Sequence, residues 1–285
     1  MSKVILGRAC AVWVLGASLA ISAVLPVRAD LLEDIKQKGQ ITIGTEARFP
    51  PFEFVENGKI VGYAPDLLAL IITKMPGVKV EQLDLPWQGI LPGLAAKKFD
   101  FVVTSVGITK ERADKYALTL PIAEATVGLL KRKNDTAINK PEDIVGKVVG
   151  SQAGSSQLKA LRDYDEKLKR DTGKGVGQIK EYVDFNEAFA DLAAGRIQAV
   201  AHSMSNLGPL VKQRGDVFAI VQPAFGPKNY FSWAGRKDPE SASLVKFFND
   251  NIAELNRSGK MKELQEKWFG FTMDVPADKV PDPTM

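Results

Sequence analysis

The stretch WQGILPGLAAKKFDFVVTSV, residues 87–106, combines the two patterns that decide the fold. Residues 89–98 have the apolar spacing of a helix, and residues 99–106 form an apolar, β-rich run that predicts a buried strand. A strand, a helix and a second strand are predicted upstream at residues 41–44, 65–74 and 78–83. Because alternating strands and helices are typical of a mostly parallel sheet covered by helices, residues 41–106 are predicted to form a βαβαβ unit.

A second unit of the same kind is predicted downstream. Its strand and helix patterns alternate at residues 148–150, 156–168, 180–183, 186–195 and 199–201. Two amphipathic helices then close the chain at residues 244–258 and 261–268, ended by Gly259 and Gly270. Together these patterns predict an α/β protein of two lobes.

The composition describes a globular chain with a packed core. Of its 285 residues, 45% are hydrophobic and 25% are charged, which is typical neither of disorder nor of repeated membrane spans. Three of the 38 basic residues, Lys3, Arg8 and Arg28, lie before residue 30, which leaves 35 basic against 34 acidic side chains. A nearly neutral body excludes a nucleic-acid clamp.

Residues 1–29 are predicted to be an export signal peptide. Lys3 and Arg8 give a positive start, an apolar stretch covers about residues 9–25, and Val27-Arg28-Ala29 has the form of a cleavage site. The alternative is an uncleaved membrane anchor, for which this interrupted apolar run is short. We therefore expect secretion into the periplasm.

Several kinds of chemistry lack the residues that they need. The only cysteine, Cys10, lies within the predicted signal peptide, which excludes disulfides from the mature chain. With a single histidine, His202, and no grouped Asp, Glu or Cys, no metal site is expected. The motifs GxSxG, GxGxxG and GxxxxGK[ST] do not occur, so hydrolytic, dinucleotide-binding and P-loop functions have no support in the sequence, and no cofactor is expected.

Seven stretches spread over nearly the whole mature chain carry a resemblance to a known family. In chain order they read GTEARFPPFEF, GYAPDL, WQGILPGLAAKKFDFV, ITKER, DIVGKVVGSQAGSS, LAAGRIQAV and ELNRSGKMKELQEKWFG. In this order they resemble the family 3 solute-binding proteins of ABC importers, which are periplasmic amino-acid receptors. The resemblance implies the type II periplasmic binding protein fold, in which two crossing hinge strands join two lobes around a ligand cleft.

The resemblance also divides the chain into lobes. After the signal peptide at 1–29, the large lobe is expected at residues 30–127 and 222–270, and the small lobe at 128–221. Residues 271–285 are expected to be a loose tail. The implied partners are a small amino-acid-like carboxylate and an inner-membrane ABC permease, with no nucleic acid, and the protein is expected to be a monomer.

Arg112 is expected to bind the carboxylate of the ligand. It follows the strand at 99–106, where a parallel sheet presents its carboxyl ends, and its planar guanidinium suits a carboxylate. The position alone fits a surface arginine, whereas the motif ITKER favours carboxylate binding. Ser155 and Ser156 open a helix and fit either an anion site or a plain N-cap. Other polar candidates for ligand binding are Thr104, Ser105, Gly107 and Gln152.

An aromatic pair and an acid are expected around the rest of the ligand. Phe49 and Trp87 match the family's stacking aromatics and are expected to clamp an apolar stem or a cation, with core packing as the alternative. Glu46 ends the first strand and is expected to meet a distal positive group. A solvated loop carboxylate is the alternative for Glu46.

The chain departs from the family at three positions. Ser203 stands where the family usually has the Asp that binds an α-ammonium, Gln198 replaces the Asp of the preceding RxDA pattern, and Gly107 stands where many relatives have Ser. Because a hydroxyl forms a weaker hydrogen bond than a carboxylate, the ligand is expected to be an amino acid or derivative that is cationic or N-substituted, such as an opine-like or betaine-like carboxylate. His202 is either a polar contact with the ligand or a loop residue facing solvent.

The function expected from these residues is that of the periplasmic substrate-binding component of an ABC importer. The alternative is a cyclohexadienyl dehydratase-like periplasmic enzyme on the same scaffold, which uses a carboxylic acid as proton donor. Glu46 could be such an acid, but Ser203 offers no carboxyl group. A receptor domain for chemosensing is a third possibility on the same scaffold.

Overall fold

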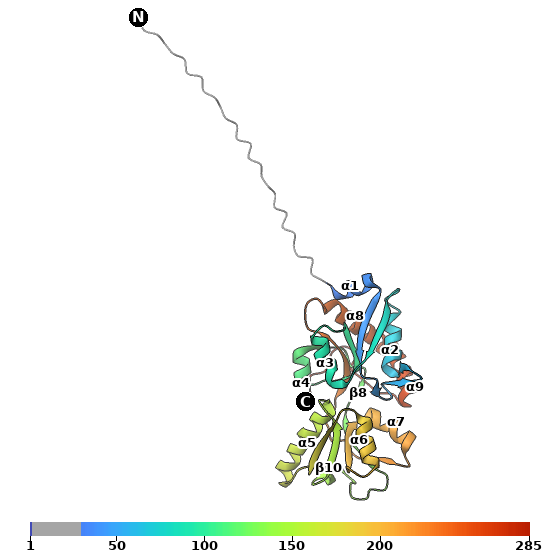
Figure 1. The fold of residues 1–285 in the computed structure, drawn as a ribbon, viewed down its shortest axis with the longest axis vertical. Helices are drawn as coiled ribbons and strands as arrows, with labels where there is room; N and C mark the ends of the chain where they lie inside the picture. Colours follow the sequence, from blue (N-terminus) through green and yellow to red (C-terminus); the bar gives the residue numbers. More distant parts are fainter. Residues whose placement is uncertain (2–29) are drawn as a thin grey trace.

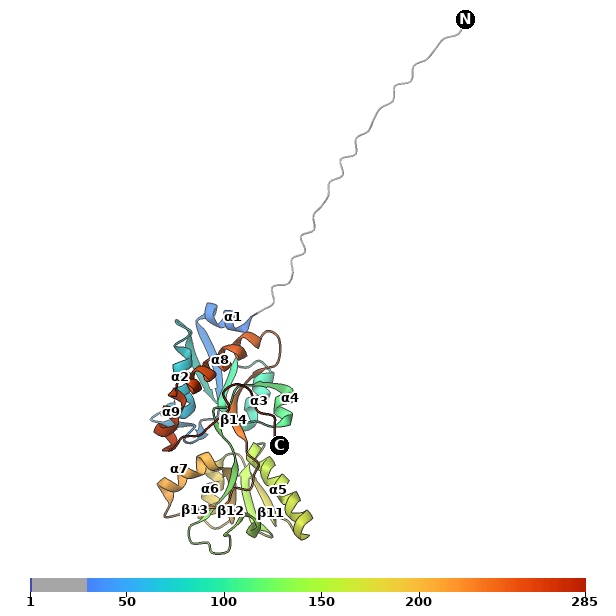
Figure 2. The same cartoon turned by 180° about the vertical axis from the view of Figure 1, so that it is seen from behind.

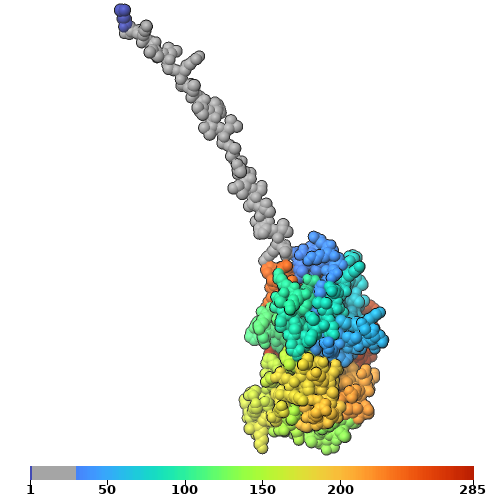
Figure 3. Space-filling view, in the orientation of Figure 1, coloured from blue at the N-terminus to red at the C-terminus, as the bar shows by residue number. Residues whose placement is uncertain are grey.

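The computed structural model describes residue 1 and residues 30–285, so the predicted signal peptide lies outside the described residues. The chain forms two α/β lobes, one above the other in Figure 1 and seen from behind in Figure 2. Each lobe is built on its own sheet, and the predicted two-lobed α/β fold is confirmed. In the space-filling view of Figure 3 the two lobes touch along the face shown.

The upper lobe contains a six-stranded sheet. Its strands lie in the order β5 (Lys79–Asp84), β1 (Gln40–Thr45), β6 (Phe101–Gly107), β14 (Tyr230–Arg236) and β7 (Tyr116–Leu118), and β8 (Ala123–Glu124) also pairs with β14. The helices of this lobe are α1 (Leu31–Lys38), α2 (Tyr63–Ile72), α3 (Trp87–Ala95), α4 (Lys110–Lys115), α8 (Ala242–Arg257) and α9 (Lys260–Phe269). Because β1 pairs in parallel with both β5 and β6, the carboxyl ends of β1 and β6 lie at one edge of the sheet.

The lower lobe contains a five-stranded sheet. Its strands lie in the order β11 (Gln178–Tyr182), β10 (Val148–Gln152), β12 (Ala199–Ser203), β9 (Val127–Arg132) and β13 (Phe218–Val221). Its helices are the short 3₁₀ turn η1 (Pro141–Ile144), α5 (Ser156–Thr172), α6 (Phe185–Ala193) and α7 (Met204–Arg214). The first three strands pair in parallel, as the βαβαβ pattern predicted, whereas β9 pairs antiparallel with β12 and β13.

Two segments cross between the lobes. One leads from β8 to β9, and the other leads from β13 back to β14. The two segments are hydrogen-bonded to each other, since the N–H of Ala125 donates to the carbonyl of Asn229 at 2.8 Å and that of Phe225 donates to Val127 at 3.0 Å. All strands of the lower sheet lie between residues 127 and 221. The lobe boundaries at residues 128 and 221 stay a prediction.

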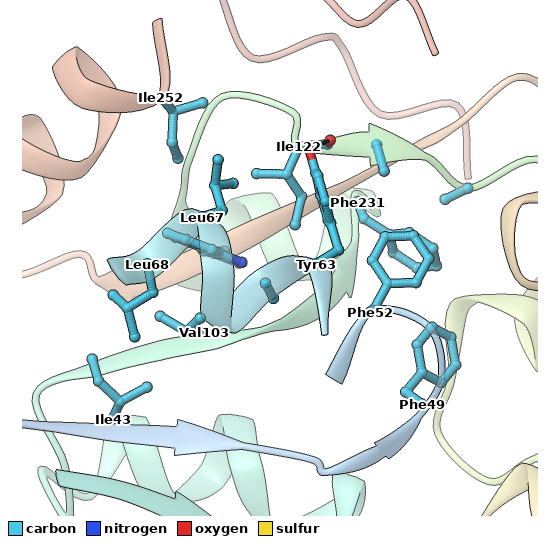
Figure 4. Close-up of a cluster of buried hydrophobic side chains, with 14 of the residues drawn as sticks. Ile43, Phe49, Phe52, Tyr63, Leu67, Leu68, Val103, Ile122, Phe231 and Ile252 are labelled. Carbon is cyan, nitrogen blue, oxygen red and sulfur yellow. Dashed lines mark hydrogen bonds between the residues drawn. The ribbon is translucent and has the colours of Figure 1, made fainter. Parts of the chain in front are cut away.

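Aromatic side chains fill the core of the upper lobe beside the junction (Figure 4). The ring centroid of Phe52 lies 5.9 Å from that of Tyr63 and 5.2 Å from that of Phe231, in edge-to-face arrangements. Tyr63 also donates to the carbonyl of Ile122 at 2.7 Å. Burying each of these rings stabilises the fold by about 2 kcal/mol. Phe49 lies at the edge of the cluster, 5.8 Å from Phe231, so the core fixes the loop that enters the junction.

Some elements are not predicted by the sequence patterns. A small sheet is formed by β2 (Arg48–Phe49), β3 (Glu53–Glu56) and β4 (Lys59–Val61). Helix α7 continues through Gly208 and Pro209, two residues that interrupt a helical pattern. The helix predicted at 89–98 lies earlier in the chain, at Trp87–Ala95, and follows Pro86 as its N-cap residue.

The C-terminal tail is irregular, but it is docked rather than loose. The carbonyl of Met285 accepts from the N–H of Lys110 at 2.9 Å, and the hydroxyl of Thr284 donates to the carbonyl of Lys228 at 3.1 Å. The side chain of Met285 packs against the core of the lower lobe, and that of Val280 packs against the upper lobe. The expectation of a loose tail is therefore wrong, because apolar tail residues find contacts that no periodic pattern reveals.

Candidate ligand-binding site

A cavity of about 10 Å³ lies between the lobes, where β1 and β6 end and α5 begins. This volume admits about one water molecule, so a larger solute requires the lobes to separate. The lining residues come from both lobes and are Glu46, Phe49, Glu53, Trp87, Thr104, Ser105, Arg112, Gln152, Ser155, Ser156 and Gln157. An open groove of about 650 Å³ outside the cavity shares Trp87, Arg112, Ser155 and Ser156 with it. Most of the residues expected from the sequence are thus brought together here.

Arg112 is buried in this cavity, with 8% of its surface exposed. Its Nη1 donates to the carbonyl of Gly107 at 2.8 Å, and its Nη2 donates to the carbonyl of Gly154 in the lower lobe at 2.9 Å. The guanidinium carbon lies 4.9 Å from the ring centroid of Trp87. Burial lowers the pKa of Arg112 to about 10. Because a guanidinium has five N–H donors, several remain for a ligand carboxylate, and the surface interpretation is wrong.

The start of α5 faces the same cavity from the lower lobe. The hydroxyl of Ser155 accepts from the N–H of Leu158 at 3.0 Å, so Ser155 is the N-cap that the simpler interpretation predicted. Ser156 is the first helical residue, and its hydroxyl donates to the side chain of Gln157 at 3.2 Å. The positive end of this helix dipole favours an anion beside Arg112, so capping and anion binding are compatible.

Gly107 ends β6 and lies directly against Ser156. A Cβ atom at position 107 would lie 2.7 Å from the Cβ atom of Ser156, closer than side chains normally approach. A side chain at position 107 therefore does not fit unless Ser156 moves away. Gly107 is not among the lining residues, and its contribution is the carbonyl oxygen that accepts from Arg112.

Glu46 connects the two lobes through a direct hydrogen bond. It is 3% exposed, and its Oε1 accepts from Nε2 of Gln152 at 2.5 Å. Burial raises the pKa of Glu46 to about 7, although the hydrogen bond from Gln152 acts in the opposite direction. The alternative of a solvated loop carboxylate is therefore wrong.

Glu53 is a second buried acid in the cavity and is not predicted from the sequence. It is fully buried on β3, and its Oε1 accepts from the hydroxyl of Thr104 at 2.6 Å and from the N–H of Ser105 at 3.0 Å. Burial raises the pKa of Glu53 to about 8. The motif GTEARFPPFEF contains Glu53 between two phenylalanines, a spacing that indicates an outward-facing side chain. Gln157 also lines the cavity without having been predicted.

Phe49 and Trp87 are buried at the cavity, 4% and 7% exposed. The ring centroid of Phe49 lies 5.0 Å from that of His202 and 5.7 Å from that of Phe185, both in the lower lobe. Phe49 therefore fits both the ligand-facing and the core-packing interpretation, because it lines the cavity and also packs in a core that spans the two lobes. Trp87 is close enough to the guanidinium of Arg112 for a cation–π contact.

His202 and Ser203 are not among the residues that line the cavity. His202 is 2% exposed on β12, its ring centroid lies 3.8 Å from that of Phe185, and burial lowers its pKa to about 3. The solvent-facing alternative is therefore wrong. The hydroxyl of Ser203 is hydrogen-bonded to Oδ1 of Asn206, whose Nδ2 donates to the carbonyl of Pro50 in the upper lobe at 2.8 Å. Both residues thus belong to the contact between lobes.

Neither a metal site nor a membrane span is found among the described residues. Within residues 30–285, no group of three or more His, Asp or Glu side chains is placed to hold a metal ion. In the same part, no helix has both the length and the apolar character that a bilayer span needs.

Two α/β lobes joined by crossing segments, with a buried arginine and two buried acids lining a cavity between them, are typical of a solute-binding protein. The family model for bacterial extracellular solute-binding proteins, family 3, matches residues 41–271. The chain belongs to this family, as the resemblance indicated.

Three similar proteins are all named for amino-acid binding. The L-cystine-binding protein TcyJ of Escherichia coli K12 is 32% identical over 269 residues, which cover 93% of this chain and 96% of TcyJ. An ancestral arginine-binding protein solved with arginine is 35% identical with a TM-score of 0.71, covering 81% of this chain and 99% of its own. The ancestral amino acid-binding protein AncCDT-1, a precursor of cyclohexadienyl dehydratase, is 28% identical with a TM-score of 0.73, covering 85% and 100%. The chain is a binding protein rather than an enzyme.

Proposed function

We propose that this chain is the periplasmic substrate-binding component of an ABC importer and that it captures a cationic or N-substituted amino acid or amino-acid derivative between its lobes. The relatives named for cystine and arginine support the amino-acid class. The signal peptide proposed at residues 1–29 would export the chain, and the mature protein would act as a monomer that delivers its ligand to an inner-membrane permease.

The observation that carries this proposal is the unpaired charge of Arg112. Its guanidinium is buried and, within the described part of the chain, donates only to the carbonyls of Gly107 and Gly154. Burying a cation costs several kcal/mol unless a counter-charge compensates it. A ligand carboxylate provides that charge and can form two parallel hydrogen bonds with the guanidinium. The start of α5 then contributes to binding only when the lower lobe closes, which couples ligand binding to closure.

The preference for a substituted amine is supported by the surroundings of Ser203. Its hydroxyl is already hydrogen-bonded to Asn206, and the position offers no carboxylate to a primary ammonium. Glu46, on the upper lobe, suits a positive group elsewhere in the ligand. These features favour a ligand whose amine is substituted or whose cationic group is distal to the carboxylate.

A thermal-shift panel followed by titration calorimetry tests the proposal. The panel contains L-arginine, L-lysine, L-cystine, octopine, nopaline and ectoine. At least one compound should raise the unfolding temperature and bind with micromolar affinity, which corresponds to about 8 kcal/mol. If none does so, the proposed function is wrong. If only neutral, unsubstituted amino acids bind, the amino-acid class holds and the cationic or N-substituted subclass is wrong.

A further inference from the structure

Three ionisable side chains line the same small cavity without an ionic partner among residues 30–285. Arg112, Glu46 and Glu53 are 8%, 3% and 0% exposed. None of them forms an ion pair within residues 30–285. Because buried charges are normally paired, the cavity is suited to a molecule that supplies charges of both signs.

Glu53 and Arg112 are both hydrogen-bonded to the carboxyl end of β6. Glu53 accepts from Thr104 and from the N–H of Ser105, whereas Arg112 donates to the carbonyl of Gly107. Residues 105 and 107 of a strand are about 7 Å apart. A small zwitterion spans such a distance when its carboxylate and its cationic group each form a charge-assisted hydrogen bond of about 2.8 Å.

The carboxyl of Glu53 retains room for a further donor. Its Oε1 accepts two hydrogen bonds, while Oε2 has only a weak contact of 3.5 Å with the hydroxyl of Ser105. A carboxylate offers about four lone-pair positions, so Oε2 can accept from a ligand. The hydroxyl of Ser203 in the lower lobe is hydrogen-bonded to Asn206, and Ser203 does not line the cavity.

We infer that Glu53 binds a cationic group of the ligand while Arg112 binds the carboxylate, so that side chains of the upper lobe hold both charges of the ligand. This inference rests on the proposed function and names the side chain that binds a cationic group of the ligand. The inference gives this role to Glu53 and not to Glu46, because Glu46 is already hydrogen-bonded to Gln152 of the lower lobe.

Binding of a cation at Glu53 is coupled to proton release. Burial raises the pKa of Glu53 to about 8, and the nearby Glu46 raises it further. A cation beside this acid favours its ionised form, so the acid loses its proton when the ligand binds and the affinity rises with pH between 6 and 8. Other charged groups around the site are Arg112 in the cavity and Arg48, Asp84 and Asp184 near Glu46.

Titration calorimetry with L-arginine, L-cystine and octopine tests this inference. Each titration is run at pH 7 in phosphate and in Tris, whose different ionisation enthalpies report the number of protons released. The native protein should release about one proton per ligand at pH 7, and its affinity should rise about fiftyfold from pH 6 to pH 8. Glu53→Gln should release less than half as many protons and bind at least tenfold more weakly. Glu56→Gln is the matched control, because Glu56 is exposed on the same strand.

The results distinguish failure of this inference alone from failure of the proposed function. If Glu53→Gln binds and releases protons like the native protein, Glu53 is not the cation-binding acid, although the importer role stands. A native affinity that does not change with pH overturns the inference even if Glu53→Gln fails to fold. Binding of uncharged or purely anionic solutes alone has the same meaning. If no compound binds at all, the proposed function and this inference fail together.

Discussion

Replacing Arg112 by alanine should weaken ligand binding strongly while changing the stability of the unliganded protein little. Removing one partner of a buried charge pair costs about 2–5 kcal/mol of binding free energy, so the affinity should fall by about 30-fold to 4,000-fold. The unliganded protein loses two hydrogen bonds to carbonyls, at Gly107 and Gly154. It also loses a buried charge whose pKa, lowered to about 10, corresponds to about 3 kcal/mol of unfavourable free energy. Because these effects oppose each other, the unfolding free energy should change by no more than about 2 kcal/mol.

Calorimetry and thermal unfolding of four proteins check this prediction. Arg236→Ala is the matched control, because Arg236 is also buried and donates to the carbonyl of Phe99 at 3.2 Å but pairs with Asp238 and lies outside the cavity. Arg236→Ala should lower the unfolding temperature more than Arg112→Ala and leave the affinity unchanged. Arg112→Lys keeps the charge but not the planar fork and should bind with intermediate affinity. Native affinity in Arg112→Ala, with a stability loss as large as that of Arg236→Ala, would refute the reasoning and make Arg112 a scaffold residue.

Four further outcomes are expected. Burial lowers the pKa of His202 to about 3, so the free energy of unfolding should fall as the pH drops below 6.5, by about 2 kcal/mol between pH 7 and pH 5. In urea unfolding, His202→Gln should lose less stability than the native protein over this pH range. Burial raises the pKa of Glu53, so the free energy of unfolding of the unliganded protein should fall as the pH rises from about 4.5 towards 8. If Glu53→Gln shows the same dependence of unfolding free energy on pH as the native protein, this prediction is wrong. Gly107→Ala should weaken ligand binding at least tenfold, because the added methyl group would meet Ser156 and hold the lobes apart. Adding Ser156→Gly to this variant should restore part of the affinity in calorimetry. If the losses of binding free energy in the two single variants simply add in the double variant, contact between positions 107 and 156 is not the cause. Incubation with prephenate or arogenate should give no ultraviolet spectrum of an aromatic product, whereas product formation would support the dehydratase alternative.

Much of the fold could be predicted because the central strands carry strong local patterns. The runs at 41–44 and 99–106 became β1 and β6, since buried parallel strands read as continuous apolar segments. Helix α7 was missed because Gly208 and Pro209 interrupt its pattern, and packing of the helix on the sheet overrides that local preference. The docking of Met285 was missed because a contact with a distant core leaves no periodic signal.

The candidate site could be predicted where a residue belongs to a recognisable motif. Arg112, Ser155 and Ser156 follow strands in such motifs, and they meet at the cavity. Glu53 could not be predicted, because its burial depends on Thr104 and Ser105, about 50 residues further along the chain.

The amino-acid sequence by itself determined the alternation of strands and helices, the two α/β units and the family, because these depend on local periodicity and on the order of motifs. Only the tertiary structure decided which side chains share the cavity and which charges are left unpaired there. Burial is a property of contacts between distant segments, so Glu53 in the cavity and His202 in the aromatic cluster could not be distinguished from exposed residues along the chain. The charges of the site follow from that burial, since removing a group from water is what shifts its pKa and creates its need for a partner.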